Sequence, residues 1–227
     1  MSSSSFGKPI LRTSGGVTLV GGGDVCAAAL GAALAVAPHL VAADCGADVA
    51  LALGHTPDMA IGDFDSISDA ARAALGPDRL HRIAEQDSTD FDKALRNVAA
   101  DFVIAVGFGG GRLDHTLAAF NVLVRHPDRR CVMLSDEDLV FLAPRDLCLA
   151  LEPGTRFSLF PMGPVQAWGT GLRWPVDGLE FAPAALIGTS NEVSDRKVRV
   201  QFSAPAMLVI LPARCLHAAL AGLGLQP

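Results

Sequence analysis

Short apolar segments alternate with helical patterns over the first ~140 residues of this chain. The apolar runs at 17–20, 40–43 and 102–106 are predicted strands, and glycine or aspartate follows each of them. The segments at 25–37 and 68–75 have the composition and end signals of helices. A repeated strand–helix–strand order predicts a parallel sheet with helices on both of its faces.

The pattern changes after residue 137. Short strand-like runs, such as 139–143, 156–160 and 198–202, are separated by Pro, Gly and Asp and show little helical periodicity. Such a pattern is typical of a small antiparallel β-sandwich or half-barrel. The predicted fold is therefore an N-terminal doubly wound, mainly parallel sheet with flanking helices in residues 1–137. A small C-terminal antiparallel β-sandwich domain is predicted in residues 138–227.

Composition limits the partners and the compartment of the chain. The net charge is −6 and no basic block stands out, so nucleic acid is not an expected partner. Five scattered cysteines without a CxxC pair predict reduced thiols in a cytoplasmic protein. The opening MSSSSFGKP lacks the pattern of a signal peptide. The longest apolar run, 25–37, is shorter than the about 20 residues that cross a bilayer, so no membrane association is expected.

Four acidic and glycine-rich stretches follow predicted strands. They are ADCGAD at 43–48, GDFDS at 62–66, DSTDFDKAL at 87–95 and GGGRLDH at 109–115. Ligands of parallel α/β sheets bind beyond the carboxyl ends of the strands, where all four stretches begin. Carboxylates hold hard cations, while basic side chains and backbone N–H groups bind phosphate. The four stretches therefore predict one site for a metal-bound polyphosphate.

The two central stretches offer metal ligands and a cation. Asp63 and Asp65 are two residues apart in extended backbone, so both carboxylates could face one ion. Asp90 and Lys93 share a helix face away from the apolar stripe, so Asp90 could bind metal and Lys93 could reach a phosphate. Plainer interpretations stay open: a turn with a helix cap at GDFDS, and an exposed ion pair with Ser88 as the helix cap.

The outer two stretches suggest nucleotide contacts. The glycines at 109–111 would let backbone N–H groups approach an anion, and Arg112 could clamp a phosphate. Asp114 and His115 would lie in the first turn of the following helix. Asp44 could bind a ribose hydroxyl or join the carboxylate cluster. The alternatives are a flexible loop at the glycines and a simple strand-end turn at ADCGAD.

Two later stretches, GLRWPVDGL at 171–179 and GTSNEVSD at 188–195, stand out in the second half. Trp174 could stack on a heterocycle, and more strongly on a cationic one. Ser190 and Asn191 offer donors and acceptors for a heteroaromatic ring. A core aromatic and a turn are the plainer alternatives.

Taken in order, these segments resemble the thiamin pyrophosphokinase family. That family shows a DGGA-like strand end, PDxxxGDFDS, a QDxTDFxKAL helix, GxxGGRxDH, GLxW/YPL and TSNE. Here the segments read ADCGAD, PDMAIGDFDS, QDSTDFDKAL, GFGGGRLDH, GLRWPVDGL and GTSNEV, between about residues 42 and 194. One departure is Cys45, which stands where the family usually has glycine.

The resemblance implies an α/β domain, a β domain and a homodimer. Thiamin would lie at the dimer interface, between the α/β site of one subunit and the β domain of the other. ATP would donate its β,γ-diphosphate to the hydroxyl of thiamin, giving thiamin diphosphate and AMP, and Mg²⁺ would be required. Two alternatives remain: a pyrophosphokinase for another heterocyclic alcohol, such as a hydroxymethylpterin, and a non-catalytic sensor that binds nucleotide or thiamin.

The resemblance also assigns the charged residues of the first half. Asp63, Asp65 and Asp90 would hold Mg²⁺–ATP. Lys93 and Arg112 would neutralise the transferred group. Positioning and charge stabilisation supply most of the catalysis in phosphoryl transfer, and these residue types suit both.

The remaining assignments concern the nucleotide and the acceptor. Asp114 would orient or deprotonate the attacking hydroxyl. Ser190 and Asn191 would hold the pyrimidine ring, with Trp174 as a stacking partner. The residues expected to contact the nucleotide are Asp44, Gly46, Ser66, Gln86, Thr89, Gly109, Gly110, Gly111 and His115.

Overall fold

The computed structural model describes residues 8–225 of the chain. It divides into two compact units, of which the first ends at Val122 and the second begins at Leu123. The domain boundary predicted after residue 137 stays a prediction. Residues 1–7 lie outside the described residues. They make up most of the opening segment for which no signal-peptide pattern was found in the sequence.

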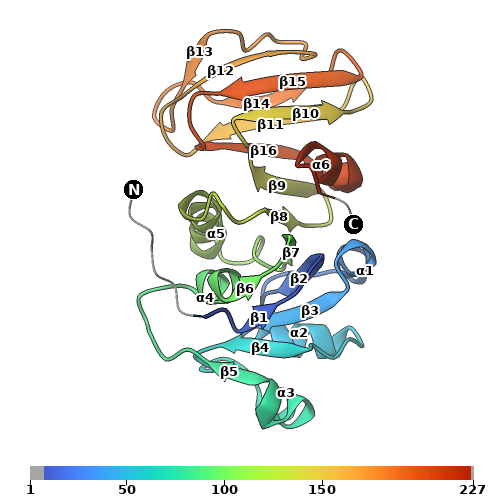
Figure 1. Ribbon diagram of the computed structural model, residues 1–227, viewed down its shortest axis with the longest axis vertical. Coiled ribbons are helices and arrows are strands. Elements are labelled where there is room, and N and C mark those ends of the chain that lie inside the picture. The colour runs from blue at the N-terminus through green and yellow to red at the C-terminus, as the bar shows by residue number, and fades with distance from the viewer. Residues whose placement is uncertain (1–7, 226–227) are drawn as a thin grey trace. The chain divides into compact units, whose positions relative to one another are not determined.

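The first unit is built on a parallel sheet with the strand order β7-β2-β3-β4-β5 (Figure 1). Every residue of β2 and β7 is buried, so both faces of the sheet are covered at its centre. The predicted doubly wound arrangement is confirmed. The strands span Gly16–Val20 (β2), His39–Ala43 (β3), Met59–Gly62 (β4), Leu80–Arg82 (β5) and Phe102–Val106 (β7).

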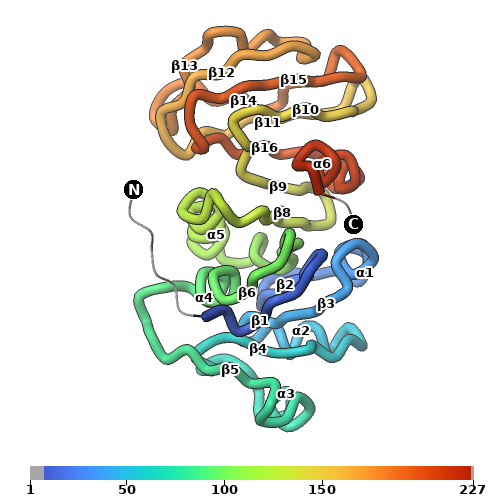
Figure 2. Tube along the Cα trace, in the orientation of Figure 1, coloured from blue at the N-terminus to red at the C-terminus, as the bar shows by residue number. Residues whose placement is uncertain are grey.

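Helices connect these strands along the chain, as the trace in Figure 2 shows. Helix α1 packs on β2 and β7, whereas α4 packs on β3 and β4. A short parallel pair, β1 (Leu11–Arg12) with β6 (Val98–Ala99), lies outside the main sheet. The helices are α1 (Ala27–Val36), α2 (Gly46–Ala52), α3 (Asp69–Leu75), α4 (Asp90–Asn97) and α5 (Leu113–Arg125), with a short 3₁₀ turn η1 (Pro77–Arg79).

Helix α2 was not predicted from the sequence. It begins directly after the acidic end of β3, where the predicted pattern held only a turn. Gly46 opens it because a Cβ at this position would lie 2.1 Å from the Val20 carbonyl oxygen. Close approach of helix to strand therefore requires glycine here.

The helix starts follow local capping. The sequence offers Ser66 or Ser68 as the cap of the next helix, and the Ser68 hydroxyl accepts a hydrogen bond from Ala71 N at the start of α3. At α4, Thr89 accepts from Asp92 N at 3.3 Å, so the proposed Ser88 cap is wrong. Lys93 is only 2% exposed, so the alternative of an exposed ion pair at this helix is also wrong.

Helix α5 forms as predicted, but the face that it buries differs from the apolar face seen in the sequence. The sequence places Leu113, Leu117, Phe120 and Val124 on one apolar face, which would be expected to pack, yet Leu113 and Leu117 are 71% and 55% exposed. The buried positions are instead Ala119, Val122 and Leu123. The helix therefore presents leucine side chains to solvent near its N-terminus.

The second unit contains two antiparallel sheets, with strand orders β14-β11-β16-β9-β8 and β10-β15-β12-β13. Residues along β15 alternate between exposed and buried, with Val198, Val200 and Phe202 facing the core. The predicted β-sandwich is confirmed.

Strands β13 and β14 and helix α6 of this unit were not predicted from the sequence. The strands are β8 (Cys131–Leu134), β9 (Asp138–Leu142), β10 (Asp146–Ala150), β11 (Arg156–Pro161), β12 (Val165–Thr170), β13 (Leu179–Phe181), β14 (Gly188–Glu192), β15 (Lys197–Phe202) and β16 (Met207–Pro212). A 3₁₀ turn η2 (Ala213–Cys215) and α6 (Leu216–Gly222) follow. Within residues 8–225, every helix is too short or too polar to cross a membrane.

Candidate active site

The strand order of the first unit creates a switch point between β2 and β7. The chain leaves β2 toward β3 on one side, and β7 returns to pair on the other side of β2. Ligands of doubly wound sheets bind in the crevice at such a point. A cavity of about 440 Å³ opens there, between the glycines at 21–23 that follow β2 and Gly107 after β7.

Many of the predicted nucleotide residues line this cavity. The glycines at 21–23 also line it; the sequence left open whether they approach a nucleotide or only turn the chain. Phe108 lines it too and was not predicted. The predicted residues that line it are Asp44, Ser66, Thr89, Asp90, Gly110, Gly111, Arg112 and His115. The predicted residues outside its lining are Gly46, Asp63, Asp65, Gln86, Lys93, Gly109 and Asp114.

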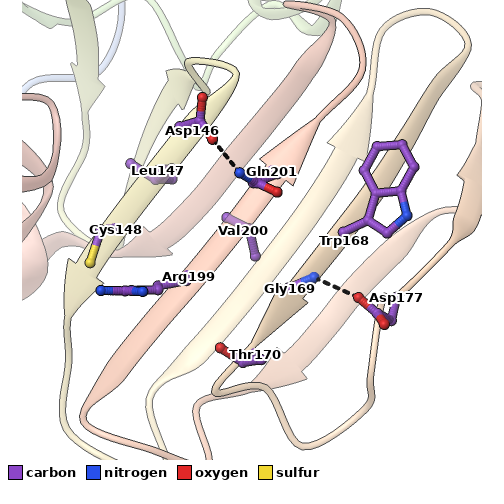
Figure 3. A pocket seen from close by; sticks show the side chains of 10 residues that line it. All are labelled: Asp146, Leu147, Cys148, Trp168, Gly169, Thr170, Asp177, Arg199, Val200 and Gln201. Carbon is purple, nitrogen blue, oxygen red and sulfur yellow. Dashed lines mark hydrogen bonds between the residues drawn. The ribbon is translucent and has the colours of Figure 1, made fainter.

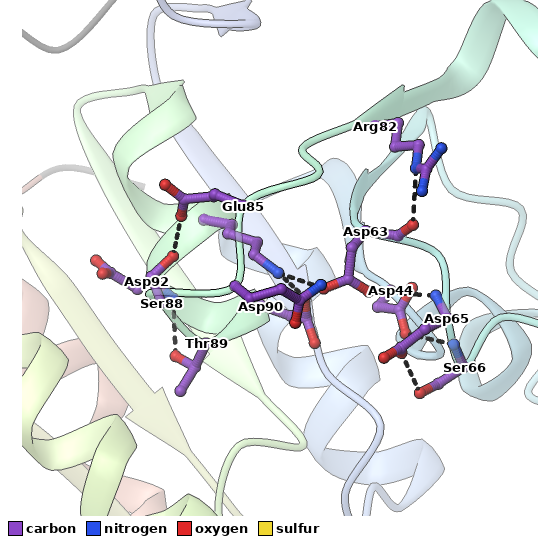
Figure 4. A network of polar contacts seen from close by, with 12 residues as sticks. Asp44, Asp63, Asp65, Ser66, Arg82, Glu85, Ser88, Thr89, Asp90 and Asp92 are labelled. Carbon is purple, nitrogen blue, oxygen red and sulfur yellow. Dashed lines mark hydrogen bonds and ion pairs between the residues drawn. The ribbon is translucent and has the colours of Figure 1, made fainter.

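Three carboxylates converge beside the cavity. Asp44, Asp63 and Asp65 each offer an oxygen, and these oxygens lie within 4.8 Å of one another (Figure 4). The sequence reading had assigned Asp44 to the nucleotide and weighed it as part of the cluster. The structure brings it together with the GDFDS pair, because β3 and β4 are adjacent parallel strands whose ends meet.

Asp44 is the most buried of the three. Its side chain is 1% exposed, and its Oδ1 has no hydrogen-bond partner among the described residues. Burial raises the pKa of Asp44, and the nearby carboxylates of Asp90 and Asp63 raise it further. A buried acceptor without a donor is costly unless a cation or proton meets it.

Lys93 lies between two carboxylates. Its Nζ donates to Asp63 Oδ2 at 2.5 Å and to Asp90 Oδ1 at 3.3 Å. Burial opposes the ammonium charge, but these hydrogen bonds outweigh it and the pKa of Lys93 is raised. The hydrogen bond from Lys93 in turn lowers the pKa of Asp63. Lys93 therefore stays cationic and Asp63 stays anionic at neutral pH.

Asp90 differs from Asp63 in the direction in which its pKa is shifted. Burial raises the pKa of Asp90, and Lys93 only partly offsets that effect. Gln86 adds a hydrogen bond to Asp63, from Nε2 to Oδ2 at 3.3 Å. Ser66 ties the cluster together, because its N donates to Asp44 Oδ2 at 3.2 Å and its Oγ donates to Asp65 Oδ1 at 2.7 Å.

The glycine loop after β7 carries a self-paired arginine. Arg112 donates to Asp114 through Nε at 3.1 Å and Nη2 at 2.6 Å, and both side chains are exposed. Hydrogen bonds from Arg112 lower the pKa of Asp114. Gly110 has φ +80°, and a Cβ there would lie 2.9 Å from Asp24 Oδ2. The predicted phosphate clamp and the predicted base thus contact each other.

The acceptor residues predicted in the second unit also gather. Trp174, Ser190 and Asn191 line a cavity of about 290 Å³ together with apolar side chains. Trp174 is 52% exposed, so it is not a core aromatic. Ser190 lies in β14 with φ +60°, so the segment is a distorted strand rather than a turn.

Asn191 holds Trp174 in place. Its Nδ2 donates to the Trp174 carbonyl at 2.7 Å, and its Oδ1 accepts from Trp174 N at 3.2 Å. The guanidinium of Arg173 lies 5.0 Å from the Trp174 ring centroid. Asn191 therefore positions the tryptophan through its backbone, a role that was not predicted from the sequence.

Another groove crosses the exposed face of the sheet β10-β15-β12-β13. Trp168, Arg199 and Asp177 line it (Figure 3). None of the residues predicted to bind substrate lies in its lining.

Two family models match this chain in the same order as the two parts of the fold. The model for "Thiamin pyrophosphokinase, catalytic domain" matches residues 31–134. The model for "Thiamin pyrophosphokinase, vitamin B1 binding domain" matches residues 148–207, and together the two cover well over half of the chain. The chain belongs to the thiamin pyrophosphokinase family. The resemblance stated from the sequence motifs is confirmed.

Similar proteins agree with the thiamin pyrophosphokinase assignment. Thiamine pyrophosphokinase 1 of Oryza sativa is 32% identical over 165 residues, covering 64% of this chain and 62% of the relative. Thiamine pyrophosphokinase 1 of Arabidopsis thaliana is 34% identical over 167 residues, covering 65% of this chain and 62% of the relative. The aligned part of the chain spans less than two thirds of the length of these plant relatives.

Solved structures of thiamin pyrophosphokinases share the fold. The Bacillus subtilis thiamine pyrophosphokinase superposes with a TM-score of 0.70 at 22% identity, over 87% of this chain and 98% of that one. The Candida albicans thiamin pyrophosphokinase gives a TM-score of 0.73 at 17% identity, over 88% of each chain.

Proposed function

We propose that this chain transfers the β,γ-diphosphate of ATP to the hydroxyl of thiamin, giving thiamin diphosphate and AMP. One observation carries the proposal. Asp44, Asp63 and Asp65 converge beside the buried Lys93, at a glycine-lined cavity in a member of the thiamin pyrophosphokinase family. Carboxylates, an ammonium and glycine backbone N–H groups are the parts that a polyphosphate site requires.

The carboxylate cluster fits Mg²⁺. Its oxygens are acceptors only, and Asp44 Oδ1 is buried without a donor among residues 8–225. We propose that Asp44, Asp63 and Asp65 hold the ion. Asp90, which the sequence assigned to the metal together with Asp63 and Asp65, lines the cavity wall instead. When bound, the cation would neutralise polyphosphate oxygens and orient the chain of phosphates.

The chain's own residues then act on the two substrates. Lys93, held cationic by Asp63 and Asp90, offsets negative charge that builds up on the transferred group. Backbone N–H groups of Gly109, Gly110 and Gly111 contact the phosphates of ATP. Gly46, Thr89 and His115 contact other parts of the nucleotide. Positioning of the hydroxyl oxygen in line with the β-phosphorus contributes the rest of the rate enhancement.

Arg112 and Asp114 exchange partners in this proposal. Arg112 leaves Asp114 for a phosphate, which frees the Asp114 carboxylate to accept the proton of the attacking hydroxyl. The bidentate pairing keeps both groups ordered and exposed beside the loop before ATP binds. The attacking oxygen forms its bond to the β-phosphorus as the bond to the bridging oxygen of AMP breaks.

The thiamin ring system is proposed to bind at Trp174, Ser190 and Asn191. Thiamin carries a positive charge, and a partly exposed indole beside polar groups suits a cationic heterocycle. Trp174→Ala is expected to raise the KM for thiamin about 10-fold, with the KM for ATP unchanged. Steady-state kinetics with each substrate varied separately measures both values.

Trp168→Ala is the matched control for this substitution. Trp168 is also partly exposed, but it lines the groove of Figure 3 and not the cavity that contains the proposed thiamin residues. Its replacement should leave both KM values unchanged. Equal effects of the two substitutions would remove Trp174 from the site.

A cytoplasmic homodimer with thiamin at its interface is part of the proposal. The exposed leucines of α5, Leu113 and Leu117, are the apolar surface that supports it. Leu117→Asp is expected to halve the mass measured by light scattering, from twice the 23.5 kDa of the chain. Ala73→Asp, which introduces the same charge at an exposed position on a different helix, α3, is the control and should stay dimeric. A wild-type mass of one chain would overturn this part of the proposal.

Acceptor competition tests the choice of substrate. The protein is incubated with ATP, Mg²⁺ and equal amounts of thiamin and a hydroxymethylpterin, and the diphosphate products are separated. Thiamin diphosphate should form nearly alone. Predominant pterin product would support the other acceptor, and nucleotide binding without AMP release would support a sensor.

A further inference from the structure

The loop at residues 62–66 has two differently bonded sides. On its inner side, backbone N–H groups point at the carboxylates. Asp65 N donates to Asp63 Oδ1 at 3.2 Å, and Ser66 N donates to Asp44 Oδ2 at 3.2 Å. The inner side thus orients the carboxylates that would meet a cation.

On the outer side, backbone carbonyls accept hydrogen bonds from two arginines. Arg82 Nε donates to the Asp63 carbonyl at 3.2 Å (Figure 4). Arg72 Nη2 donates to the Phe64 carbonyl, and its Nε donates to the Ile67 carbonyl at 3.4 Å. Arg72 comes from α3 and Arg82 from the end of β5, so the two reach the loop from separate elements.

The loop needs such support because its backbone is unfavourable. Phe64, in the middle of the loop, has φ +65°, a region that residues with a side chain rarely adopt. Asp44, which follows β3 and accepts the Ser66 hydrogen bond, is in the same region with φ +46°. The Arg72 guanidinium also lies 5.9 Å from the centroid of the Phe64 ring. In addition, three carboxylates within 4.8 Å repel one another, which favours their separation.

We propose that Arg72 and Arg82 are positioning residues for the divalent-cation site. They hold the carbonyls of Asp63 and Phe64, and so keep Asp63 and Asp65 turned toward Asp44. Neither arginine offers a ligand to the ion. The inference rests on the proposed role of the carboxylate cluster, and groups that orient metal ligands typically change metal affinity 10- to 100-fold.

Binding of Mn²⁺ alone tests the proposal without any substrate. Electron paramagnetic resonance of free Mn²⁺ gives the Kd of the wild type, Arg72→Gln and Arg82→Gln. We expect both substitutions to raise the Kd about 10-fold. The direction is decisive, because removing a positive charge near a cation site should tighten binding if charge alone mattered.

Arg79→Gln is the matched control. Arg79 Nη1 also donates to a loop carbonyl, that of Pro57 at 3.4 Å, away from the carboxylates. Its replacement should leave the Mn²⁺ Kd unchanged even if it lowers the melting temperature. Arg82→Lys, which keeps one donor, should restore part of the affinity.

Several results would overturn the inference. Unchanged or tighter Mn²⁺ binding in Arg82→Gln would do so, as would equal weakening in Arg79→Gln. If Arg72→Gln does not fold by circular dichroism, Arg82→Gln decides, because Arg82 is exposed and makes one such bond. Absence of Mn²⁺ binding in the wild type would instead overturn the proposed cation site, and this inference with it.

Discussion

Asp65→Asn is expected to lower kcat by about 10²–10³-fold without lowering the melting temperature. Asp65 is exposed, and its carboxylate contacts only Ser66 Oγ among the hydrogen bonds of the described chain. Its place is in the three-carboxylate cluster, so its charge should matter to the bound cation and polyphosphate rather than to folding. The rate of AMP formation and the melting temperature, measured on the same sample, separate the effect on activity from the effect on stability.

Asp78→Asn is the control for this charge change. Asp78 is an exposed aspartate in the turn η1, outside the cavity lining and the carboxylate cluster. The Asp78→Asn variant should form AMP at the wild-type rate. Wild-type turnover in Asp65→Asn would remove Asp65 from the site.

Lys93→Met is expected to abolish turnover and also to lower the free energy of unfolding by about 3 kcal/mol at neutral pH. Lys93 is 2% exposed and its Nζ lies 2.5 Å from Asp63 Oδ2. Loss of the ammonium leaves the Asp63 carboxylate, itself 8% exposed, without its cation. Urea unfolding measures the loss, and AMP release measures activity.

The double variant Asp63→Asn/Lys93→Met is the matched comparison. Removing both charges should recover much of the stability, because no uncompensated buried charge remains. Activity should not recover, because both groups belong to the proposed site. Stability losses that simply add would contradict the pairing.

The same pair predicts a pH dependence. The pKa of Asp63 is lowered by its hydrogen bond with Lys93, so its stabilising contribution is present above the ordinary value of 3.8. That contribution is lost as the pH falls below 3.8 and through the folded pKa. The stability difference between wild type and Lys93→Met should therefore shrink under acid conditions. A difference that grows on acidification would contradict the assignment.

Much of the fold followed from local pattern. Apolar runs ending in glycine or aspartate marked β3, β4 and β7, and parallel strands whose ends meet bring their terminal residues together. That is why Asp44 and Asp63, far apart in sequence, were expected in one site. Helix α2 escaped prediction because its start depends on a close approach of Gly46 to Val20, a long-range contact.

The chemistry of individual residues was less accessible from sequence. Spacing placed Asp90 and Lys93 on one helix face, but it could not reveal that Lys93 is buried against Asp63 of another element. Arg72 and Arg82 carry no motif signal, because they bind backbone carbonyls rather than side chains. Leu117 is the converse case: the sequence correctly predicted a helix there, but the expectation that Leu117 is buried was wrong.

Phosphate tracing from ATP tests the central claim most directly. The protein is incubated with thiamin, Mg²⁺ and ATP carrying a radiolabel either in the γ-phosphate or in the α-phosphate, with Lys93→Met as the background. The account predicts that the γ label appears in thiamin diphosphate, that the α label appears in AMP, and that the two products form in equal amounts. Label in thiamin monophosphate with ADP, or no product at saturating thiamin, would contradict it.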